Sequence, residues 1–504
     1  MNIIDLLRAR ACEIPDAPAV LTPEGILSFG ALERAVRWTA ESFRKAGLAP
    51  GDHVAVAVPE SVSHLVASLA LAHIGVGHLA LHDSDPPERQ RELVRRLGIV
   101  ATIADCTASK SNEGARIDPP PARLAELKCL TPPEIDIARG QDWPWHLMAT
   151  SGTTGEPKVM SLSHARSIAR LAGRTHGLPI GPGFSSMSLT HIAFTGAKQI
   201  LLAHLLSGSC LAFTGPLTEA EALADVLKSW RINFVAGAPI WAMQLLDIAR
   251  EGEFLLPGVD AFQVSSTVVP ESLRHNIRQR LTPNLHIAYG SNEVGMIATA
   301  PPALLDSDAS GTVGKPAPGK AVDVVDEQGR VLPIGSAGRL RVKSAGLAEG
   351  YFDDPRETAR SFRDGWFITD DRVERTPGGT LIHHGRADDM IVYDGVNIYP
   401  AEIENVLLRH AAVREAVAVP MQLRVRGHVP VAAVVLGAAA TENELMAHCR
   451  SRLGIRSPVA IQRIPKFPRN ARGKVKRQDL AKSIREAILA NTRQSARLRA
   501  PEAE

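Results

Sequence analysis

The sequence predicts an α/β fold, with a large N-terminal domain of layered α/β sheets followed by a small α+β C-terminal domain. Its 504 residues are too many for one small hydrophobic core and indicate two or more domains. Short β-rich runs alternate with helical segments through the first part of the chain, which is typical of largely parallel sheets. After about residue 310, Gly and Pro become frequent and short alternating runs appear, which indicates antiparallel hairpins.

The elements of the first part follow from its apolar runs and breaker residues. We expect a buried strand at residues 54–58, a helix at 61–74 and a strand at 75–81. Further along, residues 231–236 predict another strand, and Pro239 opens a helix that runs toward Arg250.

The last part of the chain predicts two further units. Alternating runs at residues 322–326 and 339–343 predict a small, β-barrel-like antiparallel subdomain over about residues 310–385, inside an N-terminal domain of residues 1–385. The C-terminal domain of residues 386–504 is expected to hold a helix at 400–409, a strand at 416–420, a helix at 441–453 and a frayed tail beyond residue 491.

Composition argues against several classes of function. A net charge of +3 gives no strong electrostatic attraction to nucleic acid, and 4% aromatic residues offer little base-stacking surface. The five cysteines are scattered, without a CxxC pair or a Cys/His cluster at metal-ligand spacing. We therefore expect no nucleic-acid partner, no structural zinc and a reducing compartment.

Neither a signal peptide nor a membrane span is expected. The N-terminus carries an acid at Asp5 and lacks a small-residue cleavage site. The most apolar stretch, residues 65–81, is interrupted by His73 and Gly75 and is short for a bilayer. It predicts a buried helix followed by a strand, in a cytoplasmic protein.

The most informative segment is Thr150-Ser-Gly-Thr-Thr-Gly-Glu-Pro-Lys158. Its two glycines allow backbone angles that let the loop turn N–H groups toward an anion. Its hydroxyl donors and one ammonium suit a polyphosphate; they come from Thr150, Ser151, Thr153, Thr154 and Lys158. The order differs from a Walker loop, because Lys158 follows proline and precedes no Ser or Thr. A bare Ser/Gly/Thr turn would often be only a turn, but nine residues in this order are far more specific.

This loop resembles that of the adenylate-forming superfamily, which includes acyl-CoA synthetases, adenylation domains of peptide synthetases and beetle luciferases. The resemblance implies that Thr153 is catalytic. It also implies that the nucleotide is contacted by residues 150–155, including Gly152, Thr154 and Gly155, and by Lys158. This chain departs from the family at Val159, where a glycine is usual. A second match, Ala288-Tyr-Gly-Ser-Asn-Glu293, is similar to the family's YGxTE segment. It implies that ATP is contacted by Tyr289, Gly290, Ser291 and Asn292, with Tyr289 against adenine. Glu293 would be catalytic and the Mg²⁺ ligand.

A third series looks like the family's TGD, GRxDD and GxxIxxxEIE segments: Gly365 to Asp371, Gly385 to Asp389 and Gly395 to Glu404. By this resemblance Asp371 accepts hydrogen bonds from the ribose hydroxyls, Arg386 supports the ribose or phosphate, and Asp388 is the hinge. Asp370 replaces a usual glycine, and we expect Arg372 to offset its charge. From the residues alone, Glu402 and Glu404 are interpreted as the solvated first turn of a helix.

The fourth match is Pro468-Arg-Asn-Ala-Arg-Gly-Lys474-Val-Lys-Arg477. It resembles the C-terminal loop that carries the family's catalytic lysine, here Lys474. A cation is needed where negative charge builds between a carboxylate oxygen and the α-phosphate of ATP. Taken alone, the segment would be a basic surface run; behind three ordered matches, we interpret it as the catalytic loop.

The resemblance implies two half-reactions. A carboxylic acid attacks ATP to give acyl-AMP and pyrophosphate; the mobile C-terminal domain then rotates about Asp388 and admits a thiol. Gly395 and Asn397 would line the thiol tunnel, although Asn397 stands where a basic residue is frequent. Coenzyme A is the expected acceptor. The first alternative is a stand-alone adenylation enzyme that loads the phosphopantetheine of a carrier protein. The second alternative is a degenerate family member that binds its ligands without catalysis.

The resemblance also places the acyl pocket, formed by His191, Phe194, Ala238, Trp241, Val264 and Met296. Ser265, Ser266 and Thr267 match the loop that faces adenine, with Ser-Ser in place of a common Gly-Gly. Residues 192–197 offer no acid to pair with an α-ammonium group, so an α-amino acid is disfavoured. Trp241 and Phe194 favour a compact or aromatic acid if they line the pocket, and they are core residues otherwise.

Overall fold

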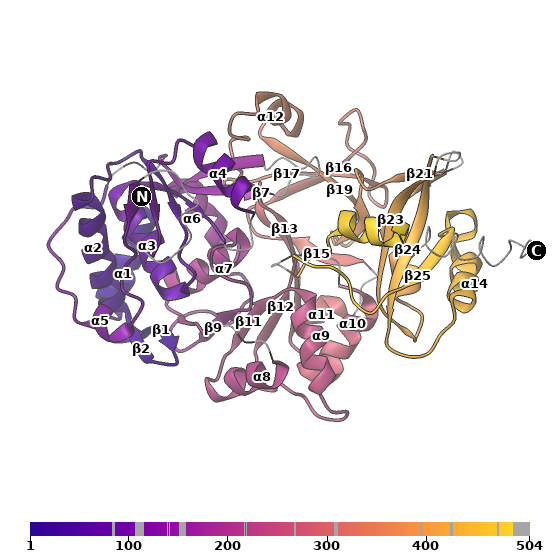
Figure 1. Cartoon of the computed structure of the whole chain (residues 1–504), viewed down its shortest axis with the longest axis horizontal. Coiled ribbons are helices and arrows are strands. Elements are labelled where there is room, and N and C mark those ends of the chain that lie inside the picture. The colour runs from indigo at the N-terminus through magenta and orange to yellow at the C-terminus, as the bar shows by residue number, and fades with distance from the viewer. Residues whose placement is uncertain are drawn as a thin grey trace, which may run out of the picture.

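The computed structural model of the chain describes residues 1–82, 86–105, 115–138, 140, 142–150, 158–215, 217, 219–266, 269–306, 311–393, 396–423, 427–470 and 473–486. Within these residues the chain forms a large α/β unit followed by a small α+β unit, as predicted (Figure 1). The exact boundary at residues 385/386 remains a prediction.

A six-stranded sheet in the described chain contains both ends of the segment Thr150–Lys158, which is predicted to bind phosphate. Its strands are parallel except for the β7–β8 pair, in which Thr150 stands opposite Lys158. The sheet order is β6 (Ala115–Ile117), β5 (Ala101–Ile103), β3 (His53–Val56), β4 (Gly77–Ala80), β7 (Pro144–Thr150) and β8 (Lys158–Ser163).

A second sheet, of 14 strands within the described residues, joins the parallel and antiparallel parts. Its parallel half is β1 (Pro18–Thr22), β10 (Cys210–Ala212), β9 (Ser185–Ser188), β11 (Phe234–Gly237), β12 (Ala261–Val264) and β13 (Leu285–Ser291), with β2 (Gly25–Ser28) antiparallel at one edge. The antiparallel half continues from β13 through β14 (Gly295–Ala300), β15 (Thr312–Pro316), β20 (Leu381–Arg386), β19 (Trp366–Arg375), β17 (Ala337–Lys343) and β16 (Ala321–Val325), with β18 (Phe362–Arg363) beside β19. The predicted antiparallel subdomain is therefore continuous with the large sheet.

Helices cover these sheets, and the apolar stretch at residues 65–81 is inside. It forms most of α3 (Ser61–Ile74) and then β4, with every residue from Val62 to Leu79 buried. A helix that is apolar on all sides must be covered on all sides, and α3 packs on α2 (Phe29–Lys45), α1 (Ile3–Glu13) and β4. The helix ends at Gly75 with φ 73°, where a side chain would also collide with the Trp143 ring.

The remaining helices of the large unit lie mostly between successive strands (Figure 1). They are α4 (Pro87–Arg96), α5 (Leu124–Lys128), α6 (His164–Ala172), α7 (Thr195–Leu206), α8 (Ala220–Ser229), α9 (Pro239–Ile248), α10 (Glu271–Asn276), the π-helical turn Ile277–Leu281, α11 (Pro302–Leu305) and α12 (Pro355–Ser361). No helix within the described residues combines the length and apolarity needed to cross a bilayer.

The small unit has its own core. The strands β23 (Val413–Leu423), β24 (Gly427–Leu436) and β25 (Ala460–Arg463) form one sheet, beside the hairpin of β21 (Ile391–Tyr393) and β22 (Val396–Ile398). One face is covered by α13 (Pro400–Leu407) and α14 (Glu442–Leu453), the latter started by a capping box between Thr441 and Glu444. The predicted strand and both helices are confirmed here; the tail lies outside the described residues.

A buried ammonium in the large unit makes stability depend on pH. Lys198 is 1% exposed, and its Nζ contacts Ser68 Oγ at 3.1 Å and His78 Nε2 at 2.7 Å. Burial lowers the pKa of Lys198 to about 7. The pKa values of His64, His78 and His146 are held well below their usual range, first by burial and then by the charge of Lys198. The folded state therefore disfavours protons that the unfolded chain accepts.

Unfolding should show this directly. Between pH 7 and about 10.4 the unfolded chain binds more protons at Lys198, so stability should rise with pH by up to about 1.4 kcal/mol per unit from this group. We expect urea denaturation at pH 7 and pH 9 to show this gain in the wild type, and Lys198→Met to lose it. If the free energy of unfolding depends on pH equally in both proteins, Lys198 is not the group responsible.

Candidate functional site

A cleft of about 2130 Å³ between the two units contains most of the predicted site residues that the structure describes. Its lining includes Lys158, Phe194, Ser265, Ser266, Tyr289, Gly290, Ser291, Asn292, Glu293, Met296, Asp371, Arg386, Asp388 and Lys474. Ser151, Gly152, Thr153, Thr154, Gly155, Thr267 and Gly395 lie outside the described residues, and only the backbones of Thr150 and Asn397 are described.

Four predicted acyl-pocket residues lie outside the cleft lining. Val264, the last residue of β12, is fully buried in a hydrophobic core, and Trp241 packs against the same core. Ala238 is 3% exposed at the start of α9. The ring of His191 contacts the carbonyl of Pro59 at 2.8 Å. Phe194 and Met296 are thus the two of the six that line the cleft.

Within the cleft, Tyr351 lies between Lys158 and Glu293. Lys158 Nζ lies 2.6 Å from Glu357 Oε1 and 5.1 Å from the ring centre of Tyr351. The Tyr351 hydroxyl in turn donates to Glu293 Oε1 at 3.0 Å. Hydrogen bonds from Arg360 and then Lys158 lower the pKa of Glu357 to about 2, so this carboxylate is ionised beside the lysine. Tyr351 and Glu357 carry no local sequence signal and were not predicted.

A second cluster surrounds Asp371, the predicted ribose ligand. Asp371 accepts from the Tyr289 hydroxyl at 2.5 Å, and His383 Nε2 lies 3.3 Å away. Burial alone would raise the pKa of Asp371, but hydrogen bonding and charge from His383, with Tyr289 and Arg386, hold it below its usual value. The pKa of Tyr289 is raised by burial and by Asp371, so Tyr289 remains the donor. His383, on β20, was not predicted.

The charge of Asp370 is balanced differently from the prediction. Arg339 on the adjacent strand β17 lies 2.8 Å from Asp370, and Arg386 lies 3.7 Å away. Arg372 instead stacks on Tyr399, 5.1 Å from the ring centre, and bonds its hydroxyl at 3.2 Å. The expectation that Arg372 offsets Asp370 is therefore wrong, because the cross-strand neighbour supplies the cation.

Arg386 and the predicted hinge residue are bound to each other. Both oxygens of Asp388 accept from Arg386, at 2.7 and 2.6 Å. This fork-shaped pair is the geometry that arginine and carboxylate favour. A third group of Arg386, Nη1, lies 4.0 Å from Asp371, so the predicted nucleotide side chain and the predicted hinge meet in one network.

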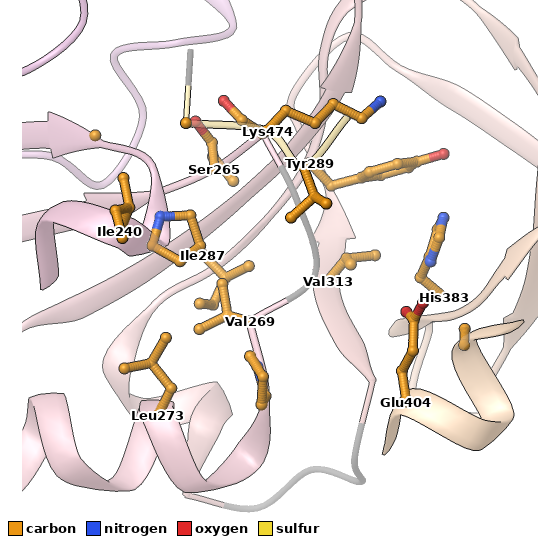
Figure 2. Close-up of a pocket in the computed structure, with 18 of the residues that line it drawn as sticks. Ile240, Ser265, Val269, Leu273, Ile287, Tyr289, Val313, His383, Glu404 and Lys474 are labelled. Carbon is orange, nitrogen blue, oxygen red and sulfur yellow. The ribbon is translucent and has the colours of Figure 1, made fainter. Parts of the chain in front are cut away.

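Lys474 enters the same cleft from the C-terminal unit. Its backbone is fixed by a bond from Lys474 N to Asn470 Oδ1 at 3.0 Å and one from Asn470 N to Lys474 O at 2.9 Å. Figure 2 shows its side chain extended past Ser265 toward Tyr289. Burial, then the charges of Arg386 and Arg477, lower the pKa of Lys474, while Asp389 and Asp371 oppose that shift.

The Lys474 loop is anchored to α13, which corrects the interpretation of Glu404. Arg477 Nη2 lies 2.7 Å from Glu404 Oε1, and the same carboxylate accepts from Ala418 N at 2.9 Å. Glu404 is therefore a mostly buried tether and not a solvated helix turn. Glu402 Oε2 lies 3.7 Å from Arg456 Nη1, an ion pair too long for a hydrogen bond.

Buried cations support the Tyr289–Glu293 segment from below. Arg170, 2% exposed, donates to the carbonyls of Asn292 at 2.8 Å and Glu293 at 2.6 Å. Ser266, which also lines the cleft, has φ 80°, a conformation that favours glycine, at a position where the resembling family commonly has glycine.

Close packing at Gly473 gives a test of the docked arrangement. Gly473 has φ 75°, and a Cβ there would lie 2.8 Å from Ile240 Cγ2 in the large unit. The left-handed backbone should cost Gly473→Ala about 1–2 kcal/mol, and the collision with Ile240 should weaken docking in addition. Acid-dependent pyrophosphate release should therefore slow by about tenfold or more. Adding Ile240→Ala should restore part of that rate in stopped-flow assays. No rescue by the second substitution would contradict this docking contact.

The described part of the chain thus forms two units that share one cleft, lined by Lys158 and Asp371 from the large unit and by Lys474 from the small one. Comparison identifies the family. The family model for AMP-binding enzymes matches residues 7–352, and that for the AMP-binding enzyme C-terminal domain matches residues 402–474. The chain belongs to the AMP-binding enzyme family.

Similar proteins include a synthetase, a CoA ligase and an ATP-bound crystal structure. Malpibaldin synthetase of Mortierella alpina is 28% identical over 94% of this chain, but the chain spans only 9% of that protein. Sulfoacetate–CoA ligase of Cupriavidus necator is 28% identical, over 94% of this chain and 96% of the relative. The crystal structure of ATP-bound MatB from Rhodopseudomonas palustris superposes with a TM-score of 0.84 and 25% identity, covering 96% and 99% of the two chains.

Proposed function

We propose that this protein activates a carboxylic acid with ATP, forming acyl-AMP and pyrophosphate, and then transfers the acyl group to coenzyme A. The observation that carries the proposal is the meeting of Lys474, from the C-terminal unit, with Tyr289, Asp371 and Glu293 in one cleft. Family membership and the full-length similarity to a CoA ligase support it.

The residues of the cleft suit the first half-reaction. Adenine would lie along Tyr289, and the ionised Asp371 would accept from the ribose hydroxyls. The acid's carboxylate oxygen forms a bond to the α-phosphorus while the bond to the β-phosphate oxygen breaks. Lys474 would stabilise the charge that develops between the two reactants, and positioning and charge neutralisation supply most of the catalysis.

Magnesium fits this cleft together with a substrate. Within the described residues, no group of three or more His, Cys, Asp or Glu could hold a metal ion. Glu293 offers one carboxylate, whose Oε1 already accepts from Tyr351. One carboxylate plus phosphate oxygens is the usual arrangement for Mg²⁺, which would neutralise phosphate charge when bound. Glu293 would hold the ion, and Lys158 would neutralise further phosphate charge.

The second half-reaction requires a thiol. The thiol attacks the acyl carbonyl, a thioester forms, and AMP leaves with the oxygen that joined it to the acyl group. Coenzyme A is favoured by the CoA ligase similarity, and a carrier-protein phosphopantetheine by the similarity to a peptide synthetase. Assays with both thiols separate the two.

The proposal is tested by acid-dependent pyrophosphate release. A panel of aliphatic and aryl acids is incubated with ATP, Mg²⁺ and purified protein, with a no-acid blank. We expect at least one acid to raise pyrophosphate well above the blank and to give a thioester when CoA is added. If no acid of either kind raises pyrophosphate, the protein is a binding member of the family without catalysis.

A further inference from the structure

The wall of the cleft contains an arginine that the proposed chemistry does not use. Arg174 lies two residues beyond the end of α6 and lines the cleft. Its Nη2 donates to Gln199 Oε1 on α7 at 3.3 Å, the one hydrogen bond of this side chain within the described residues. Its Nε is buried without a partner, and so is the Nε2 of Gln199. The pair therefore has donors on both side chains that no described acceptor uses.

No carboxylate in the described chain balances Arg174. Burial is the sole cause that lowers its pKa, to about 10, so it stays charged at neutral pH without a nearby acid to stabilise it. Its charge in turn lowers the pKa values of Arg170, Lys320 and His204, after burial as the main cause. Arg174 is partly exposed and lines the cleft, but its Nε is buried without a hydrogen-bond partner, and a buried donor without an acceptor is costly.

Neighbouring cations already have their partners. Arg170 donates to the carbonyls of Asn292, Glu293 and Gly346, and Lys320 donates to Ser344 Oγ at 2.6 Å. The carboxylate among them, Glu293, accepts from Tyr351. Arg174 thus has only the neutral amide of Gln199 as a described acceptor, and the neighbouring Arg170 and Lys320 add positive charge that attracts an anion.

Arg174 and Gln199 lie at the acyl side of the cleft. A Cβ on Gly295, where β14 begins, would lie 3.5 Å from Gln199 Oε1, and Gly295 has φ 81°. Met296 follows on the same strand, and Phe194 precedes the helix that carries Gln199. Both are predicted acyl-pocket residues that line the cleft. The Tyr289–Asp371 pair and Lys474 form a separate cluster in the same cleft.

We propose that the acid activated by this protein carries a second anionic group, a carboxylate or sulfonate, that binds Arg174 and Gln199. This inference rests on the proposed function and names its substrate class. An oxyanion would accept from the guanidinium in a charge-assisted bond and supply the missing acceptor. A site built to bind a polar group rejects analogues without that group strongly, because its own donors then stay unpaired.

The test compares matched pairs of acids in the pyrophosphate assay. Each pair has one dicarboxylic acid and the monocarboxylic acid with a methyl group in place of the second carboxylate, in short aliphatic and aryl series. For at least one pair we expect the wild type to favour the dianion by about 10²-fold or more in kcat/KM. Arg174→Met should remove most of that preference, and Arg174→Lys, which keeps a charge, should remove less. Arg91→Met, an exposed arginine of α4, is the matched control.

The outcomes distinguish this inference from the function on which it rests. Preference of the wild type for the methyl member of every pair, or an equal preference ratio in Arg174→Met, would overturn the inference and leave acid activation standing. If none of the acids tested raises pyrophosphate above the blank, both the inference and the proposed function are overturned. Calorimetry of the best dianion with the AMP-bound protein gives a readout independent of turnover: affinity should fall in Arg174→Met, and an unchanged affinity would also overturn the inference.

Discussion

Lys474→Ala should lose acyl-adenylate formation by about 10²–10³-fold or more while transfer from a supplied acyl-adenylate to the thiol stays largely intact. Lys474 lies in the cleft with Asp371 and Arg386, and burial and neighbouring cations lower its pKa. Its ammonium is needed where the carboxylate and α-phosphate meet and has no role once that bond exists. The two half-reactions are measured separately, by pyrophosphate release and by thioester formation from synthetic acyl-AMP.

A matched lysine distinguishes a specific effect from general damage. Lys466 is exposed, and it precedes the same loop without lining the cleft. Lys466→Ala should leave both half-reactions unaffected. Equal loss of both half-reactions in Lys474→Ala would show misfolding or a different catalytic lysine.

Asp388→Pro should have the opposite profile, with acyl-adenylate formed and thioester formation lowered by about 10²-fold or more. Proline fixes one backbone angle, so a residue that must change its backbone on domain rotation can no longer do so. The Asp388 backbone N–H makes no hydrogen bond to another described residue, so proline removes no donor that the docked arrangement uses. Thioester and pyrophosphate are followed in the same reaction.

The Arg386 pair supplies the control for this substitution. Asp388→Pro also removes the two bonds to Arg386, and Asp388→Ala removes them without restricting the backbone. We expect Asp388→Ala to retain most thioester turnover. Full thioester turnover in Asp388→Pro would show that the hinge lies elsewhere.

The sequence predicted those parts of the site that depend on local patterns. Tyr289, Asp371 and Lys474 each stand in an ordered segment, and the structure brings all three into one cleft. The alternation of strands and helices likewise predicted β3, α3 and β4 in order, because apolar periodicity is a local property.

Contacts made only by tertiary packing could not be predicted. His383 reaches Asp371 across two paired strands, and Arg339 reaches Asp370 from the next strand over. Arg174 and Gln199 meet between the end of one helix and the middle of another. Each is a single residue without a surrounding pattern, and the register of distant strands decides its neighbours.

Acid activation is tested most directly by following the carboxylate oxygen that is proposed to form a bond to the α-phosphorus of ATP. The acid carrying ¹⁸O in both carboxylate positions is converted with ATP and thiol, and the products are examined by mass spectrometry. Attack on the α-phosphorus leaves one ¹⁸O in AMP and none in pyrophosphate, which is the result we expect. AMP without ¹⁸O, or label in inorganic phosphate, would contradict it.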